Sequence, residues 1–190
     1  SLPSRPFPAL GEVNCIPQLL EEHAPKLIAE AAELLKLSVS YGESPTGAKV
    51  DGGWDSGLFS KEVEGLHTPR DGFAHYDVLS ACHSDETRKE LPTFCSVLDE
   101  LHTRTNAQVE LARISRLQAG VSLSAHTGLH NRRWRCHLGL KLAKSHTARL
   151  YVANQMKEWE VGKAFVFDDS FEHHVSWEPN PSKVDLSAAE

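Results

Sequence analysis

The chain has no apolar run that approaches the ~20 residues needed to cross a bilayer, and no hydrophobic segment typical of a signal peptide. We therefore expect no membrane segment within this chain. Because the sequence begins at Ser1 rather than Met, the presence of an upstream anchor or targeting segment stays open, and so does the compartment.

Positive charge is also scarce. The 20 Lys and Arg residues are outnumbered by 26 Asp and Glu residues, which gives a net charge of −6. This balance argues against nucleic acid or an anionic membrane as the main partner. The basic residues Arg132, Arg133 and Arg135 form only a local cluster.

The four cysteines form no Cys-x-x-Cys pair and have no zinc-finger spacing. Cys82 and Cys95 could form a disulfide in an oxidising compartment, and two reduced thiols are the alternative. The cysteines therefore do not decide the compartment.

The first half of the chain, residues 1–105, is predicted to consist of helices and loops. Pro17 suits the first turn of a helix, and apolar residues recur at helical spacing up to Leu35. Pro25 predicts either a short helix followed by a longer one, or a kink. A second amphipathic helix fits Leu91–Leu101. Residues 40–57 indicate a loop, and Lys49–Phe73 a lip over a pocket.

The second half, residues 106–190, has the short alternating apolar runs typical of strands. The pattern predicts β-structure in four runs, which are Val109–Leu117, Trp134–Leu142, Ala148–Ala153 and Lys163–Phe167. Helices followed by strands at this spacing indicate one α+β domain, mainly β, built on a sandwich, jelly roll or barrel.

Two histidines, His126 and His173, lie on neighbouring stretches of predicted β-structure and indicate a mononuclear metal centre, since imidazole suits Fe, Zn and Cu. The third ligand of a 2-His-1-carboxylate centre would stand at Gly128, which has no ligating side chain. Asp168 or Asp169 could supply the carboxylate, but turn formation or hydrogen bonding around the site is the commoner role of such a pair. With eleven histidines in the chain, chance placement is the alternative.

One face of the predicted strand after residue 134 has Arg135 and His137 side by side, and Cys136 points to the other face. Such a face suits an anionic ligand, because guanidinium matches a carboxylate; a solvated strand face is the alternative. Ser115 would look into the same cavity if its strand pairs beside Arg135. We expect Trp54 and Trp159 to pack in the core or the lip rather than stack on substrate. We expect His130 and His146 to lie at the surface.

Four sequence motifs, in this order and spacing over about residues 105–178, resemble the catalytic domain of aspartyl/asparaginyl β-hydroxylases. They are His126-Thr127-Gly128, Asn131–Leu140, Trp159–Lys163 and Phe167–His173. The resemblance implies a single oxygenase domain over residues 1–190, in which a double-stranded β-helix (a cupin-like jelly roll) with N-terminal flanking helices binds Fe(II) and 2-oxoglutarate.

Carried over residue by residue, the resemblance implies that His126 and His173 hold the iron and that Gly128 marks a vacant carboxylate position. Ser115, Arg135 and His137 match positions that contact 2-oxoglutarate. The family usually has an Arg where this chain has Lys183, which supplies charge without a planar fork. Either Lys183 replaces that Arg, or the chain is truncated or altered there, or cosubstrate binding is weaker.

The implied reaction uses O₂ and 2-oxoglutarate to hydroxylate an unactivated carbon, namely the β-carbon of an Asp or Asn in a protein, peptide or small molecule. Two alternatives stay open. A related halogenase would place halide at the vacant position, and a degenerate β-helix would bind a partner without catalysis. A zinc hydrolase is disfavoured, because catalytic zinc usually takes three protein ligands.

Overall fold

The computed structural model describes residues 5–9, 12–13, 16–40, 73–105, 108–117, 122–144 and 146–180. The predicted loop after residue 40, the predicted lip up to residue 72, Trp54 and Lys183 lie outside the described residues.

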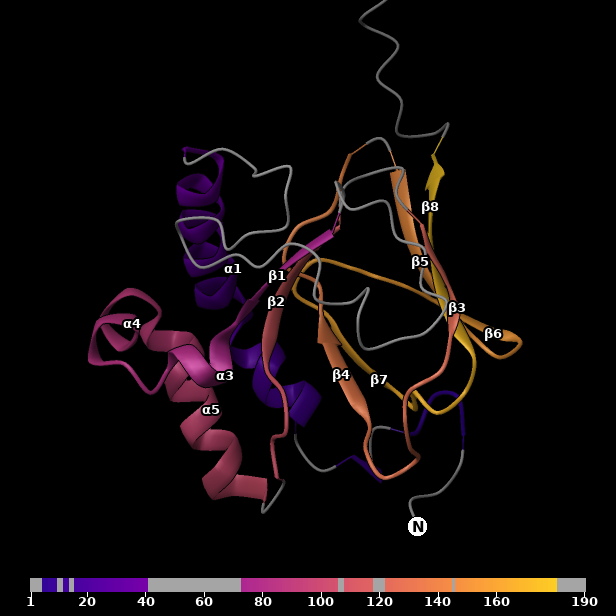
Figure 1. Cartoon of the computed structure of the whole chain (residues 1–190), viewed down its shortest axis with the longest axis horizontal. Helices are drawn as coiled ribbons and strands as arrows, with labels where there is room; N and C mark the ends of the chain where they lie inside the picture. The colour runs from indigo at the N-terminus through magenta and orange to yellow at the C-terminus, as the bar shows by residue number, and fades with distance from the viewer. Residues whose placement is uncertain are drawn as a thin grey trace, which may run out of the picture.

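The helices gather on one side of the molecule and most strands on the other (Figure 1). The helices are α1 (Ile16–Ser40), α3 (Val78–Ala81), α4 (Asp85–Glu90) and α5 (Pro92–Thr105). Helix α1 continues through Pro25, so the predicted division into two helices is wrong. Its buried side chains, which include Leu19, Leu27 and Leu34, pack against α5 and the strands, and this burial outweighs the one hydrogen bond that proline removes.

Helix α5 confirms the predicted amphipathic helix over Leu91–Leu101 and extends it by one turn. It begins at Pro92, a position where a missing N–H is harmless. The carboxylate of Glu30 in α1 accepts hydrogen bonds from the backbone N–H groups of Thr93 (2.8 Å) and Phe94 (3.1 Å). Helix α1 thus caps the N-terminus of α5 with a negative charge, where the helix dipole favours it.

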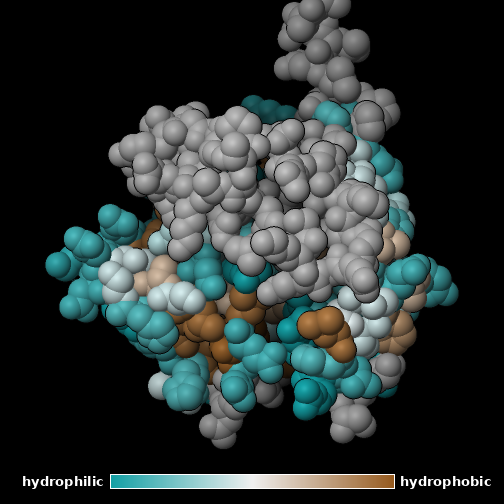
Figure 2. Space-filling view, in the orientation of Figure 1, coloured by the Kyte–Doolittle hydropathy of each residue, from teal (hydrophilic) through white to brown (hydrophobic). Residues whose placement is uncertain are grey.

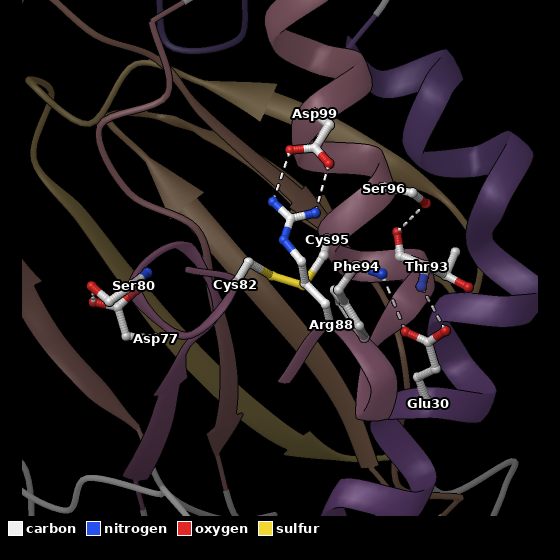
Figure 3. Close-up of a disulfide and its surroundings, with 10 residues drawn as sticks. All are labelled: Glu30, Asp77, Ser80, Cys82, Arg88, Thr93, Phe94, Cys95, Ser96 and Asp99. Atoms are coloured by element: carbon white, nitrogen blue, oxygen red, sulfur yellow. Dashed lines mark hydrogen bonds and ion pairs between the residues drawn. A yellow bond between two sulfur atoms is a disulfide. The ribbon is translucent and has the colours of Figure 1, made fainter. Parts of the chain in front are cut away.

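A disulfide joins Cys82, at the end of α3, to Cys95 in α5 (Figure 3). Both residues are buried and belong to a hydrophobic cluster with Val78, Leu34 and Ile114. Beside it, Arg88 and Asp99 link α4 to α5 through two hydrogen bonds. The sequence left open whether these two cysteines form a disulfide or remain reduced thiols, and the structure has the disulfide.

Eight strands form three antiparallel sheets within the described residues. A two-stranded sheet pairs β1 with β2, a four-stranded sheet has the order β3-β8-β5-β6, and a third sheet pairs β4 with β7. The strands are β1 (Phe73–Asp77), β2 (Arg113–Leu117), β3 (Leu123–His126), β4 (Arg135–Leu138), β5 (His146–Val152), β6 (Gln155–Glu158), β7 (Ala164–Phe167) and β8 (His173–Pro179).

The four predicted strand runs each overlap an observed strand, namely β2, β4, β5 and β7, so the α+β class with a mainly β second half is confirmed. Strand β5 begins at His146, two residues before the predicted run. Strand β1 corrects the prediction that residues 1–105 hold only helices and loops. Its partner β2 comes after three helices, and a five-residue strand stabilised by so distant a pairing gives no local periodicity to read.

The core between the strands is formed by Leu150 and Val152 of β5, Phe167 of β7 and Val175 of β8. Phe7 from the N-terminal segment packs against this cluster and meets Phe165 edge-on at 6.3 Å. Among the residues coloured in Figure 2, most on the face shown are hydrophilic, with smaller hydrophobic areas between them. The described part of the chain has no helix that is both long and apolar enough to span a bilayer.

Candidate metal centre

His126 on β3 and His173 on β8 are direct partners across an antiparallel strand pair. Their rings lie 4.2 Å apart, centroid to centroid. His173 is buried on the same side of β8 as Val175, whereas the neighbouring His174 turns to the other face and stacks on Tyr151 at 4.7 Å. The structure therefore brings together the two histidines that the sequence predicted as metal ligands.

Both imidazoles are oriented by the same kind of hydrogen bond. The Nδ1–H of His126 donates to the carbonyl of Ser124 at 2.8 Å, and that of His173 donates to the carbonyl of Phe171 at 2.8 Å. Because a carbonyl only accepts, each ring has a proton on Nδ1, and in the neutral imidazole the lone pair is then on Nε2. Burial lowers the pKa of His173. The hydrogen bond to the carbonyl of Phe171 raises this pKa in part, and the nearby His126 lowers it again, so the net shift is downward. Neutral imidazoles with a free Nε2 are the form that binds metal.

Gly128 lies directly against the carboxylate of Asp169. Its N–H donates to the Asp169 carbonyl at 2.6 Å, and a Cβ at this position would lie 2.6 Å from Cγ and 2.7 Å from each carboxylate oxygen of Asp169. Its backbone has no positive φ, so glycine is needed here for space and not for conformational freedom. The space that a ligating side chain at position 128 would need is filled by Asp169.

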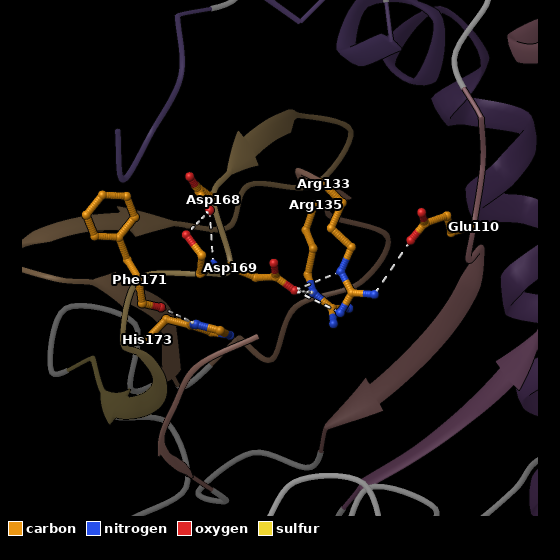
Figure 4. A network of polar contacts seen from close by, with 8 residues as sticks. Glu110, Arg133, Arg135, Asp168, Asp169, Phe171 and His173 are labelled. Atoms are coloured by element: carbon orange, nitrogen blue, oxygen red, sulfur yellow. Dashed lines mark hydrogen bonds and ion pairs between the residues drawn. The ribbon is translucent and has the colours of Figure 1, made fainter. Parts of the chain in front are cut away.

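Asp169 is fully buried and is held by two arginines (Figure 4). The Nε of Arg135 donates to Oδ2 at 2.7 Å, and Arg133 binds the same oxygen at 3.3 Å while its other edge lies 3.8 Å from Glu110. Oδ1 of Asp169 is buried without a hydrogen-bond partner in the described part of the chain. The local basic cluster in the sequence gave no reason to place Arg133 here, because its partner Asp169 comes from a distant turn.

Asp168 has the turn-forming role that the sequence favoured for one of this pair. Its Oδ1 accepts hydrogen bonds from the backbone N–H (3.0 Å) and the hydroxyl (2.6 Å) of Ser170. Both aspartates therefore have hydrogen-bonding roles around the two histidines.

His137 lies among aromatic rings. It stacks on Trp159 at 5.8 Å, lies 5.9 Å from Phe165 and meets Phe167 edge-on at 5.0 Å. Burial lowers its pKa to about 3, and the charge of Arg135 acts in the same direction. His137 is thus neutral at physiological pH, and the positive charge on this face comes from arginine. The packing role predicted for Trp159 is confirmed.

Ser115 lies on β2, opposite His75 of β1, and its side chain is exposed. In the described residues β2 pairs with β1 and not with the strand of Arg135, so the pairing on which a shared cavity depended is not made. A cosubstrate contact at Ser115 stays a prediction. His130 and His146 were expected at the surface, but both are half-buried.

The arrangement fits a metal ion held by two imidazoles. The Nε2 atoms of His126 and His173 are available, and the buried Oδ1 of Asp169 lacks a partner among the described residues. Within those residues no three His, Cys, Asp or Glu side chains form a metal-binding group, so the candidate centre rests on the two histidines. Two imidazoles near a buried carboxylate suit iron better than catalytic zinc, which usually takes three protein ligands.

Fold and site together define an α+β protein in which two histidines pair across neighbouring strands. The model of the family described as aspartyl/asparaginyl beta-hydroxylase matches residues 21–186, which is most of the chain. The chain belongs to the aspartyl/asparaginyl beta-hydroxylase family.

Three relatives carry the word hydroxylase in their names. The chain is 34% identical over 119 residues, 63% of its own length and 16% of the other, to aspartyl/asparaginyl beta-hydroxylase of Homo sapiens. It is 31% identical over 176 residues, 90% of its length and 46% of the other, to aspartate beta-hydroxylase domain-containing protein 2 of Rattus norvegicus. It is also 27% identical over 145 residues, 76% of its length and 47% of the other, to the ornithine lipid ester-linked acyl 2-hydroxylase of Rhizobium tropici. The chain thus spans less than half the length of these relatives.

Proposed function

We propose that this chain is a hydroxylase domain that uses Fe(II), 2-oxoglutarate and O₂ to hydroxylate an unactivated carbon. The observation that carries the proposal is the pairing of His126 with His173, both with Nδ1 bound to a backbone carbonyl. Family membership supports the reaction class. We also propose that the sheets close into a double-stranded β-helix, with the two histidines on its inner side.

In this proposal His126 and His173 hold the iron through Nε2. Bound Fe(II), together with 2-oxoglutarate, would supply the activation of O₂ that an unactivated C–H bond requires. Asp169 orients Arg135 through its Nε, which leaves the outer N–H groups of the guanidinium for a carboxylate of the cosubstrate. Lys183 and Ser115 are proposed as further contacts to 2-oxoglutarate.

Neutral His137 contributes a hydrogen-bonding group without charge, and its aromatic neighbours form an apolar wall. The ring of Phe167 packs edge-on against the rings of His137 and His173, with centroid distances of 5.0 Å and 5.3 Å. The wall therefore continues from the strand of Arg135 and His137 to the metal-ligand candidate His173. Such a wall excludes water and strengthens the electrostatic interactions of Arg135 inside the site.

The proposed substrate is an Asp or Asn side chain in a protein, peptide or small molecule, hydroxylated at the β-carbon. The human relative is named aspartyl/asparaginyl beta-hydroxylase, and the rat relative is named for an aspartate beta-hydroxylase domain. The halogenase alternative has less support, because the carboxylate of Asp169 already lies against Gly128 and a halide there would face a like charge.

The test is turnover of purified protein with Fe(II), 2-oxoglutarate and Asp- or Asn-containing peptides, with succinate and product mass as readouts. We expect succinate formation coupled to the gain of one oxygen atom in the product. His126→Ala should abolish both, whereas His174→Ala, which alters a histidine on the opposite face of β8, should retain them. Undiminished turnover in His126→Ala would reject the assignment of the metal ligand, and a chlorinated product in the presence of chloride would favour the halogenase.

A further inference from the structure

The turn between β7 and β8 is built around a buried carboxylate. Asp168 is only 2% exposed, and its Oδ1 accepts both the backbone N–H and the hydroxyl of Ser170. Its own N–H donates to the carbonyl of Pro6 at 3.1 Å, which ties the turn to the N-terminal segment. Burying a carboxylate is unfavourable unless it is hydrogen-bonded, so these contacts fix the turn in one arrangement.

The turn continues without a break into the metal-ligand candidate (Figure 4). The N–H of Phe171 donates to the carbonyl of Asp168 at 3.4 Å, and the carbonyl of Phe171 accepts the Nδ1–H of His173 at 2.8 Å. Three hydrogen bonds in series therefore connect Pro6 through Asp168 and Phe171 to the imidazole of His173. Ser170 supports this series by its two bonds to the carboxylate of Asp168.

We propose that Asp168 and Ser170 are positioning residues that set the tautomer of His173 and so its affinity for metal. The Phe171 carbonyl can hold the proton of His173 on Nδ1 only while the turn holds that carbonyl in place. When the turn loosens, the imidazole also adopts the tautomer with the proton on Nε2, and that form has no lone pair to offer at this nitrogen. This inference rests on the proposed function where it concerns the metal, but the tautomer itself is a property of the metal-free protein.

The second histidine is an internal reference. His126 donates to the carbonyl of Ser124, which lies in the same strand, β3, and not in the turn. Changes at Asp168 and Ser170 should therefore act on His173 and leave the tautomer of His126 as it is.

The first experiment measures imidazole ¹⁵N chemical shifts in metal-free protein, because these shifts distinguish the two tautomers. Wild-type His173 should show the Nδ1–H form, and Ser170→Ala and Asp168→Asn should shift His173 toward a mixture while His126 stays unchanged. Ser170→Thr keeps the hydroxyl and should restore the wild-type pattern. An unchanged His173 tautomer in folded Ser170→Ala would overturn the proposal, even where Asp168→Asn fails to fold.

The second experiment measures binding of Co(II) by its visible spectrum. Loss of a group that orients a metal-bound histidine typically weakens metal affinity about 10–100-fold, and we expect a loss in this range for Asp168→Asn and a smaller one for Ser170→Ala. The matched control is Ser176→Ala, which removes a hydroxyl from the outer face of β8, where it donates to Glu178 at 3.2 Å, and should leave affinity unchanged. A lower melting temperature with unchanged Co(II) affinity in both turn variants would show a purely structural role and overturn the proposal. Failure of the wild type to bind Co(II) would contradict the proposed function instead, and the ¹⁵N shifts would still decide the role of the turn.

Discussion

Replacing Gly128 by Ala tests the packing of the candidate site directly. The added methyl group would lie 2.6–2.7 Å from three atoms of the Asp169 carboxylate. Asp169 has no room to retreat, because it is fully buried and two arginines bind its Oδ2. Relief of the clash therefore requires either a shift of the backbone at Gly128, which is tied to the Asp169 carbonyl, or weaker contacts to Arg133 and Arg135.

The magnitude follows from these two routes. Overpacking of a tightly filled site costs about 1–3 kcal/mol, and a hydrogen bond to a charged group contributes roughly 1.5–3 kcal/mol. Since the protein relaxes by whichever combination of the two routes costs less, we expect Gly128→Ala to lower the free energy of unfolding by about 1–3 kcal/mol. For a chain of this size each kcal/mol lowers the melting temperature by about 2–4 °C.

The assay is denaturant unfolding of Gly128→Ala, Asp169→Ala and the double variant. Asp169→Ala removes all three atoms that the new methyl group would meet, so the cost of Gly128→Ala should fall by about 1 kcal/mol or more in that background. The same cost in both backgrounds would refute the steric account of Gly128. Asp169→Ala alone should also destabilise, because it leaves Arg133 and Arg135 without their shared partner.

Three further predictions concern the rest of the fold. Glu30→Ala should lower the free energy of unfolding by about 1–2 kcal/mol in denaturant titrations, because the cap of α5 is lost, and Glu30→Gln should cost less; equal costs would count against a charged cap. The double change Cys82→Ala and Cys95→Ala opens a bridge of sequence separation 13 and should cost about 3 kcal/mol by loop-closure entropy, with unchanged melting temperature as the contradicting result. Burial raises the pKa of the Cys136 thiol to about 12. The thiol of the unfolded chain ionises at lower pH, so between about pH 9 and 12 the free energy of unfolding should fall more in the wild type than in Cys136→Ala. Thiol reagents should label the native protein slowly, and rapid labelling at pH 8 would show that the thiol is accessible.

The features of the fold that depend on local pattern were predictable from the sequence. Helical spacing gave α5, and alternation gave the strands β2, β4, β5 and β7. Strand β1 was not predictable, because its pairing with β2 joins segments that are distant in the chain. Pro25 predicted either two helices or a kink, and α1 runs through it as one helix whose buried side chains pack against α5 and the strands.

At the site, the sequence identified which residues to examine but not how they contact one another. That His126 and His173 lie close together was expected from their predicted role as metal ligands. Their direct pairing across β3 and β8 was not, because neither histidine lies in one of the four predicted strand runs. The contact of Asp169 with Gly128 was not readable, because it depends on how a turn packs against a loop from another strand. The neutrality of His137 was also hidden, since it follows from the aromatic rings that three-dimensional packing collects around the imidazole.

The measurement that tests the central claim most directly is an anaerobic titration of the purified protein with Fe(II) and 2-oxoglutarate. The account predicts a visible metal-to-ligand charge-transfer band in the wild type and in His174→Ala, and its loss in His173→Ala. A well-folded wild type without the band, or a band of equal intensity in His173→Ala, would contradict the two-histidine centre.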